Sequence, residues 1–95
     1  MANFVICYDV RVTNHDYKAL YSALDAWGAK HLQNSVWLLS INGSARTIRD
    51  TLKNAMHQND TLAVVQLPDT APGNADWATS FDRHEGVDWL RQHYG

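Results

Sequence analysis

The chain has 95 residues, of which 45% are hydrophobic and 19% are charged, and its formal net charge is −2. This balance excludes an intrinsically disordered chain and argues against nucleic-acid binding through overall positive charge. The single cysteine excludes a disulfide within the chain. The length predicts one domain over residues 1–95, whose thin core a second copy could complete.

The N-terminal segment MANFVICYDV predicts neither export nor membrane insertion. No basic residue precedes its apolar run, and the run is too short for a signal peptide or a membrane span. We therefore expect a cytoplasmic protein that has no membrane partner.

The first part of the chain predicts a strand followed by a helix. Residues Asn3–Asp9 are an apolar run with β-branched and aromatic side chains, which is typical of a central strand. Cys7 lies within this run and is expected to be a small buried side chain. Asp16–Trp27 has one apolar stripe at helical spacing, with Asn14 as a candidate N-cap and Gly28 where a helix commonly ends.

The middle of the chain predicts two strands, a helix and a further strand. His31–Ile41 is a β region, and the polar residues 33–35 indicate a turn within it. Ser44 is a candidate N-cap for the helix that follows. Thr61–Leu67 predicts the last strand, which Pro68 ends. The apolar stripe of the helix consists of Ala45, Ile48, Leu52 and Ala55 or Met56.

This order predicts an α+β fold, a ferredoxin-like βαββαβ sandwich with two helices on one face of a four-stranded antiparallel sheet. The other sheet face would be bare, which suggests a partner. Residues 1–67 are the predicted core, and 68–95 are a C-terminal extension. Within the extension, Trp77–Phe81 predicts a short fifth strand. A short helix is predicted from the spacing of Val87, Leu90 and Tyr94.

Three short motifs are similar to those of a known family. Tyr8-Asp9-Val10 ends the first strand, and Asp60-Thr61-Leu62 begins the last core strand. Between them lies Gln33-Asn34-Ser35-Val36-Trp37. These motifs resemble the "YD", D-x-aliphatic and Q-x-S-V-F segments of the CRISPR-associated Cas-two family. The tail, with Asp76-Trp77-Ala78 and Asp88-Trp89-Leu90, resembles the SinR-like branch of that superfamily.

The resemblance implies a homodimer in which the two sheets face each other. It also implies a metal-dependent nuclease activity centred on Asp9, the acid of the first strand. Other family members act as non-catalytic scaffolds on duplex DNA, and ribonucleases of toxin–antitoxin systems share the fold. The family often carries an arginine near the second strand, where this chain has Lys30 and His31.

Asp9 is the candidate catalytic and metal-ligating residue. A carboxylate at the end of a central strand can hold Mg²⁺ or Mn²⁺ beside a phosphate, where the metal can activate a water. One carboxylate per chain is a poor ligand set, so we expect a two-fold axis near Asp9 to supply a second copy. The alternative is that the Asp9 side chain caps an adjacent turn.

Ser35 and His31 are the other candidate catalytic residues. The Ser35 hydroxyl can bond a phosphate or a metal-bound water, and His31 can act as a general acid or base. The ring of Trp37, like that of Tyr8, can stack on an unpaired base. The alternatives are that Ser35 satisfies local backbone, that His31 is an ordinary surface residue, and that the two aromatic rings fill the core or the dimer seam.

Basic side chains provide candidate contacts to RNA or DNA. Arg11 and Lys18 flank the loop after Asp9 and can steer a phosphate backbone toward it. Three more recur on the second predicted helix, opposite its apolar stripe: Arg46, Arg49 and Lys53. These three side chains could equally well form a solvated helix face, in which Arg46 pairs with Asp50 four residues later.

These observations leave three functional hypotheses. The first is a dimeric metal-dependent endonuclease that cuts RNA or DNA through paired Asp9 carboxylates. The second is a non-catalytic dimeric scaffold that binds nucleic acid or a protein. The third is a ferredoxin-like dimer whose aromatic residues line a small-molecule pocket. The resemblance favours the first two hypotheses together.

Overall fold

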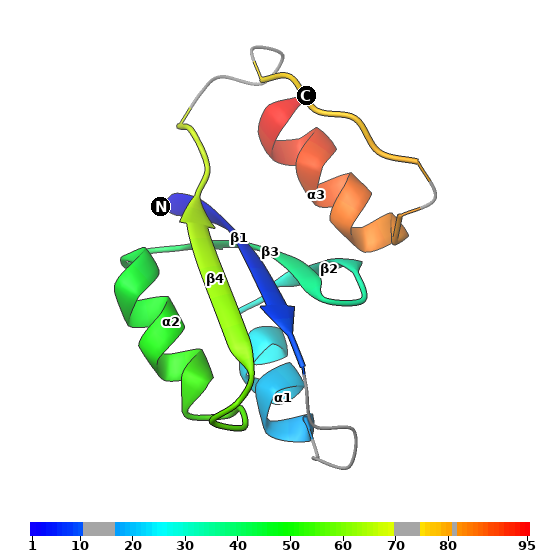
Figure 1. The fold of residues 1–95 in the computed structure, drawn as a ribbon. Helices are drawn as coiled ribbons and strands as arrows, with labels where there is room; N and C mark the ends of the chain where they lie inside the picture. Colours follow the sequence, from blue (N-terminus) through cyan, green and yellow to red (C-terminus); the bar gives the residue numbers. More distant parts are fainter. Residues whose placement is uncertain (11–16, 70–74, 81) are drawn as a thin grey trace.

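The computed structural model describes residues 1–10, 17–69, 75–80 and 82–95. Its elements are β1 (Ala2–Asp9), α1 (Lys18–Ala26), β2 (Lys30–Gln33), β3 (Val36–Ile41), α2 (Ala45–Lys53), β4 (Thr61–Gln66) and α3 (His84–Tyr94), as drawn in Figure 1. The strands form one antiparallel sheet in the order β2-β3-β1-β4. The predicted α+β class and the four-stranded antiparallel sheet are therefore confirmed.

Capping residues fix the end of α1 and the beginning of α2. The Ser44 hydroxyl accepts a hydrogen bond from the Thr47 amide at 3.2 Å, so Ser44 is the N-cap of α2 as predicted. Gly28, just beyond α1, has a φ of 77°, and its amide donates to the Asp25 carbonyl at 3.0 Å. The predicted N-cap of α1, Asn14, lies outside the described residues.

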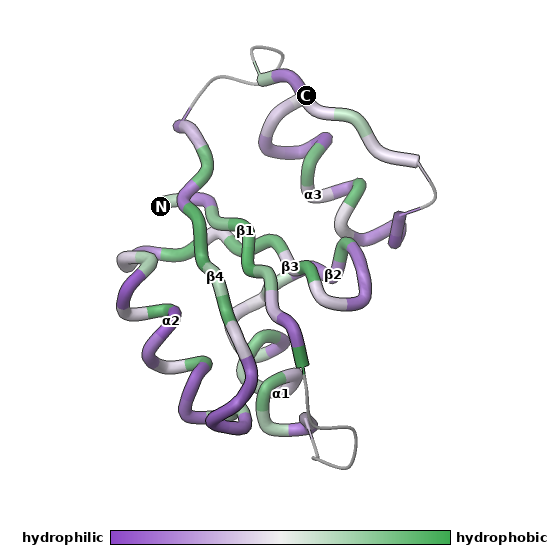
Figure 2. Tube along the Cα trace, in the orientation of Figure 1, coloured by the Kyte–Doolittle hydropathy of each residue, from purple (hydrophilic) through white to green (hydrophobic). Residues whose placement is uncertain are grey.

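Helices α1 and α2 cover one face of the sheet (Figure 1). The central strand β1 sends Phe4, Ile6 and Tyr8 into this layer, because alternate side chains of a strand point to the same face. These side chains pack against the apolar stripes of the two helices, which are Leu20, Leu24, Ile48 and Leu52. The tube in Figure 2 is strongly apolar along β1 and β4 and largely polar along α2, as this layering requires.

Helix α3 packs on the opposite face, which the sequence predicted to be bare. Its residues Trp89, Leu90 and Tyr94 form a second apolar cluster with Leu38 of β3. The Tyr94 hydroxyl also donates to the Pro68 carbonyl at 2.9 Å. The predicted C-terminal helix is confirmed, but its amphipathic face buries part of the sheet surface that we expected a partner to cover.

In the described part of the chain, β1 and β4 keep exposed side chains on this face, and we call their surface the open half. Val65, at 55% exposure, is its most exposed large apolar side chain. Cys7 is exposed on the same surface, so the expectation of a buried Cys7 is wrong: its side chain points away from the α1–α2 layer. The open half consists of the cross-strand pairs Asp9–Thr61 and Cys7–Ala63 and of Val65. The partner of Val65 in the register, Val5, is half-buried and packs against the α3 cluster.

The chain before α3 covers the edge of β2. The Arg83 amide donates to the Leu32 carbonyl at 3.0 Å, and a Glu85 carboxylate oxygen accepts from the His31 amide at 3.1 Å. Residues 77–80 form no strand, so the predicted fifth strand is absent there; Phe81, the last residue of that prediction, lies outside the described residues. Across the described parts of the chain, no helix has the length and apolar character needed to cross a membrane.

Close packing of α3 on β2 makes Gly86 a sensitive position. A Cβ on Gly86 would lie 2.6 Å from Leu32 Cα and 2.7 Å from the His31 carbonyl oxygen, and both atoms belong to backbone. We expect Gly86→Ala to lower the free energy of unfolding by about 1–3 kcal/mol, since α3 must shift to remove the overlap. Urea denaturation measures this effect.

The matched control is Gln92→Ala, at an exposed position of the same helix. It should leave stability within about 0.5 kcal/mol of the parent. A Gly86→Ala variant as stable as the parent would contradict the close approach of α3 to β2.

Candidate functional site

Asp9 lies at the end of β1 on the open half, with its side chain exposed. It stands beside Thr61 of β4 in the strand register, and the two residues border a hollow of about 300 Å³. The other residues along this hollow include Cys7 and Ala63. The structure therefore places the predicted metal ligand on an accessible and partly apolar surface, where a phosphate or a second copy could approach it.

One copy of the chain gives a cation few ligands at Asp9. Among the described residues, no group of three His, Cys, Asp or Glu side chains lies close enough to hold a metal ion. Mg²⁺ typically takes one or two carboxylates and keeps several waters. The Asp9 carboxylate and the neighbouring Thr61 hydroxyl are hard oxygen donors that suit this ion.

Behind Asp9, the Tyr8 hydroxyl joins β1 to the β2–β3 turn. It accepts a hydrogen bond from Trp37 Nε1 at 3.0 Å and donates to the Asn34 carbonyl at 3.2 Å. The backbone repeats the link, since the Tyr8 amide donates to the Ser35 carbonyl at 3.1 Å. Burial raises the pKa of Tyr8 well above the ordinary value for tyrosine, so this phenol stays protonated and continues to donate.

A second hollow, which we call the turn pocket, lies at the β2–β3 turn on the α1 side. It has a volume of about 430 Å³ and is lined by Tyr21, Asp25, His31, Asn34, Trp37 and Arg83. The His31 ring stacks on Trp37 with ring centroids 4.0 Å apart, as their pairing across β2 and β3 requires. The pocket thus combines aromatic rings with one acidic and one basic side chain.

Arg83 is the functional candidate that sequence reasoning missed. Its guanidinium donates to Asn34 Oδ1 at 2.9 Å, across 49 residues of chain. The resemblance implied an arginine near the second strand, where the local sequence has Lys30 and His31. The backbone bonds that attach the chain before α3 to the β2 edge bring Arg83 there instead. No local pattern around Arg83 indicates this long-range contact.

The other predicted site residues are only partly brought together. Ser35 is half-buried, and its carbonyl, bonded to the Tyr8 amide, places it at the same end of the sheet as Asp9. Lys18 is exposed at the first position of α1. Arg11 lies outside the described residues.

The predicted basic group of α2 lies on the opposite side of the sheet from Asp9, because α2 packs in the other layer. Arg46 is exposed there. Arg49 is bound to the Asp50 carboxylate at 2.9 Å, and Lys53 donates to the Asp60 carbonyl at 2.6 Å. Lys53 therefore fastens the chain that follows α2, and the three side chains do not form a continuous surface with Asp9.

The Asp60-Thr61-Leu62 motif of the resemblance has a structural explanation. Asp60 is 3% exposed, and its carboxylate accepts hydrogen bonds from the Tyr17 hydroxyl at 3.1 Å and from the His57 amide at 3.0 Å. An acid at this position thus fixes the start of β4 against the start of α1. Thr61 of β4 lies beside Asp9 in the strand register, so Asp60 helps to fix the Asp9 end of the open half.

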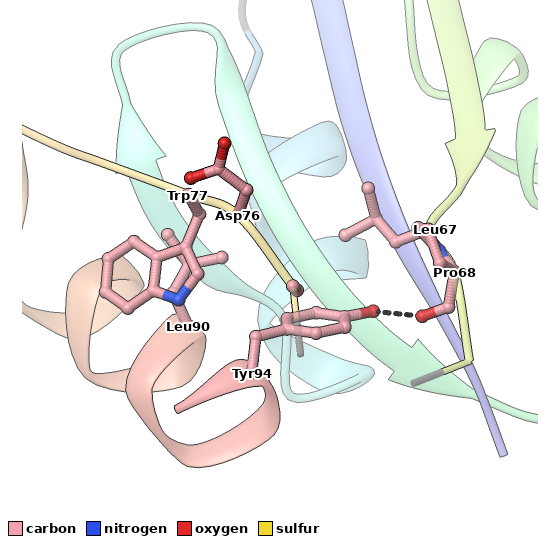
Figure 3. Close-up of a pocket in the computed structure, with 7 residues that line it drawn as sticks. Leu67, Pro68, Asp76, Trp77, Leu90 and Tyr94 are labelled. Atoms are coloured by element: carbon pink, nitrogen blue, oxygen red, sulfur yellow. Dashed lines mark hydrogen bonds between the residues drawn. The ribbon is translucent and has the colours of Figure 1, made fainter. Parts of the chain in front are cut away.

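A third cavity, of about 390 Å³, lies where the C-terminal segment meets the end of β4 (Figure 3). Its lining is mainly apolar and includes Leu67, Trp77 and Leu90. The Tyr94 hydroxyl that reaches it is already bonded to the Pro68 carbonyl and to the Asn3 amide group. This cavity offers a phosphate or a metal no free basic or chelating set among the described residues.

No known family model matches the chain.

The link through the Tyr8 hydroxyl is tested by Tyr8→Phe. The change leaves the buried Trp37 indole N–H without its acceptor, so we expect the free energy of unfolding to fall by about 1–3 kcal/mol at pH 8. Urea denaturation measures the loss. Gln92→Ala, at an exposed position of α3, is the control and should cost less than about 0.5 kcal/mol.

The loss of stability caused by Tyr8→Phe also depends on pH. The pKa of Tyr8 is raised in the folded state, so above about pH 10 the unfolded tyrosine loses its proton first and the parent protein loses stability as pH rises. Tyr8→Phe removes this contribution, and the stability difference between the two proteins should narrow between pH 8 and pH 11. A constant difference over that range would contradict the buried, protonated phenol.

Proposed function

We propose that two copies of the chain pair across the open half and that the dimer acts on RNA or DNA as a metal-dependent endonuclease. The observation that carries the proposal is that Asp9 shares one uncovered sheet surface with Cys7, Ala63 and Val65. Association removes such apolar side chains from water. A symmetric dimer over this surface uses the same patch on both copies, and an axis that passes at the Asp9 end of the patch would bring the two Asp9 residues together.

The two edges of the sheet favour association on the β4 side. Arg83 and Glu85 already occupy backbone groups of β2 at one edge. At the other edge, no strand of the described chain pairs with the outer side of β4. Unpaired strand edges readily accept another chain. A second copy that covers the open half therefore also lies beside the one edge that can be extended.

In this dimer, each copy would contribute one Asp9 carboxylate to a shared cation. A bound Mg²⁺ or Mn²⁺ would stabilise charge on a phosphate oxygen and lower the pKa of a water that attacks phosphorus. The two carboxylates would hold the cation, and the Thr61 hydroxyl, next to Asp9 in the register, would lie close enough to Asp9 to help orient a bound water. Lys18, exposed at the start of α1, can approach the phosphate backbone.

We also propose a ferredoxin-like topology and membership of the Cas-two-like superfamily, in its SinR-like branch. The element order and the strand order β2-β3-β1-β4 support the topology. Contacts between the motifs support the family: Tyr8 of the first motif bonds Asn34 and Trp37 of the second.

A non-catalytic scaffold is the second candidate. It is favoured by the single acid at Asp9 and by the absence of a metal-ligating group of three among the described residues. Such a scaffold would use the same dimer and would bind nucleic acid without cutting it. The Asp9 experiment below separates the two candidates.

The dimer surface is tested by Val65→Lys. Placing a charge where Val65 is 55% exposed on the open half should convert the dimer to a monomer, because the charge would have to lose its water in the interface. Sedimentation velocity at several protein concentrations measures the mass. Ala19→Lys, which puts the same charge on the exposed face of α1, is the control and should stay dimeric.

The catalytic role is tested by Asp9→Asn. We expect cleavage of single-stranded RNA or DNA in Mg²⁺ or Mn²⁺ to fall at least ~100-fold, because the neutral amide no longer holds the cation, while the mass of the dimer is unchanged. Asp50→Asn, on α2, should cleave like the parent. Undiminished cleavage by Asp9→Asn would exclude this site, and a parent that binds but never cleaves would establish the scaffold.

A further inference from the structure

The turn pocket contains the chemical groups that recognise a single nucleotide. We propose that it binds one unpaired nucleotide of a single strand, with a base that carries an exocyclic amino group. This inference rests on the proposed function, because it names the form of nucleic acid that the dimer would act on. It concerns a different surface from Asp9, so the two ideas can fail separately.

The aromatic wall of the pocket presents His31 and Tyr21. Trp37 is only 5% exposed, and the His31 ring lies over it at an interplanar angle of 11°. The Tyr21 ring is 42% exposed and tilted against the same indole, with centroids 6.1 Å apart. A base entering the pocket would therefore stack on His31 or Tyr21, whose orientation the buried indole maintains. This assigns Trp37 a supporting role, where the sequence suggested direct stacking.

The hydrogen bond of His31 also favours stacking over proton transfer. Its Nε2 lies 3.1 Å from the Asn34 carbonyl oxygen. A carbonyl can only accept, so Nε2 carries the proton and donates it. Nε2 is engaged with backbone and one ring face lies on Trp37, so the opposite ring face is available for a planar ligand to stack on. The geometry thus points to a planar ligand rather than to general base catalysis through this nitrogen.

Asp25 and Arg83 give the pocket its polar selectivity. No carboxylate pairs with Arg83 in the described part of the chain, and no basic side chain pairs with Asp25 there. The bond to Asn34 orients the Arg83 guanidinium but uses one of its five donors, so the rest can bind a phosphate. Asp25, near the end of α1, can accept a hydrogen bond from the amino group of cytosine or adenine, which uracil lacks.

The size of the pocket favours one nucleotide. Its volume of about 430 Å³ is within the range of ordinary small-ligand sites. A base inside a duplex is stacked and paired, so it cannot reach the wall without being extruded, whereas an unpaired base can. The pocket also lies at the same end of the sheet as Asp9, since Tyr8, the neighbour of Asp9, bonds to Asn34. A strand anchored there could continue round the end of β1 toward the open half.

The experiment titrates the full chain with cytidine, adenosine and uridine 5′-monophosphates. It follows the Trp37 indole N–H by NMR, because this group lies beneath the pocket and is bonded to Tyr8. We expect the cytidine and adenosine nucleotides to shift this resonance and to bind at least ~5-fold more tightly than uridine monophosphate. No shift with any of the three, or equal affinity for all, would overturn the inference.

Two variants assign the contacts. Arg83→Gln should weaken the binding of all three nucleotides by at least ~5-fold, since it removes the phosphate contact. Asp25→Ala, at an exposed helical position, should abolish the preference over uridine monophosphate. Arg91→Gln, on the exposed face of α3, is the control and should bind like the parent. Parent-like binding by both Arg83→Gln and Asp25→Ala would exclude the pocket.

Cleavage and mass measured on the same preparations keep the two ideas distinguishable. Nucleotide binding that depends on Arg83 and Asp25, in a protein that never cleaves, would support the nucleotide site and exclude the nuclease activity. Cleavage that depends on Asp9 but is unchanged in the Arg83 and Asp25 variants would support the nuclease activity and exclude the nucleotide site.

Discussion

A β-sheet has two faces to cover, and in the described part of this chain the helices cover one face fully and the other only in part. Helices α1 and α2 close one face around Phe4, Ile6 and Tyr8. On the other face, the α3 cluster contains Leu38 of β3 and packs against Val5 of β1, whereas Cys7 is exposed. The surface over β1 and β4 keeps exposed apolar side chains beside a carboxylate. Both the proposed dimer and the proposed metal site follow from this incomplete cover, because the same uncovered patch carries Asp9.

The hydrogen bonds of Tyr8 connect the two candidate sites. Its side chain points into the α1–α2 layer and holds Trp37 and the Asn34 carbonyl, while the next residue, Asp9, points to the open half. The alternation of strand side chains thus places the turn pocket and the acid on opposite faces at one end of the sheet. A single strand that binds both proposed sites would pass around this end of the sheet.

Local patterns in the sequence predicted much of the fold. The Ser44 cap, the end of α1 at Gly28 and the turn between β2 and β3 depend on near neighbours, and the structure confirms them. The exposure of Cys7 could not be predicted in the same way. An apolar run does not reveal which face of the strand a later helix will cover, and α3, formed by the last residues, covers too little to bury Cys7. The contact of Arg83 with Asn34 is also beyond local patterns, since 49 residues separate them.

The most direct measurement of the central claim is the separation of the two Asp9 carboxylates in a crystal structure of the dimer. Ligand distances of ~2.1 Å, with room for shared waters, require the carboxylates to lie roughly 4–8 Å apart. The account predicts a separation in this range, across an interface that contains Val65 of both copies. Carboxylates on opposite sides of the assembly, or a chain that is monomeric at every concentration, would contradict it.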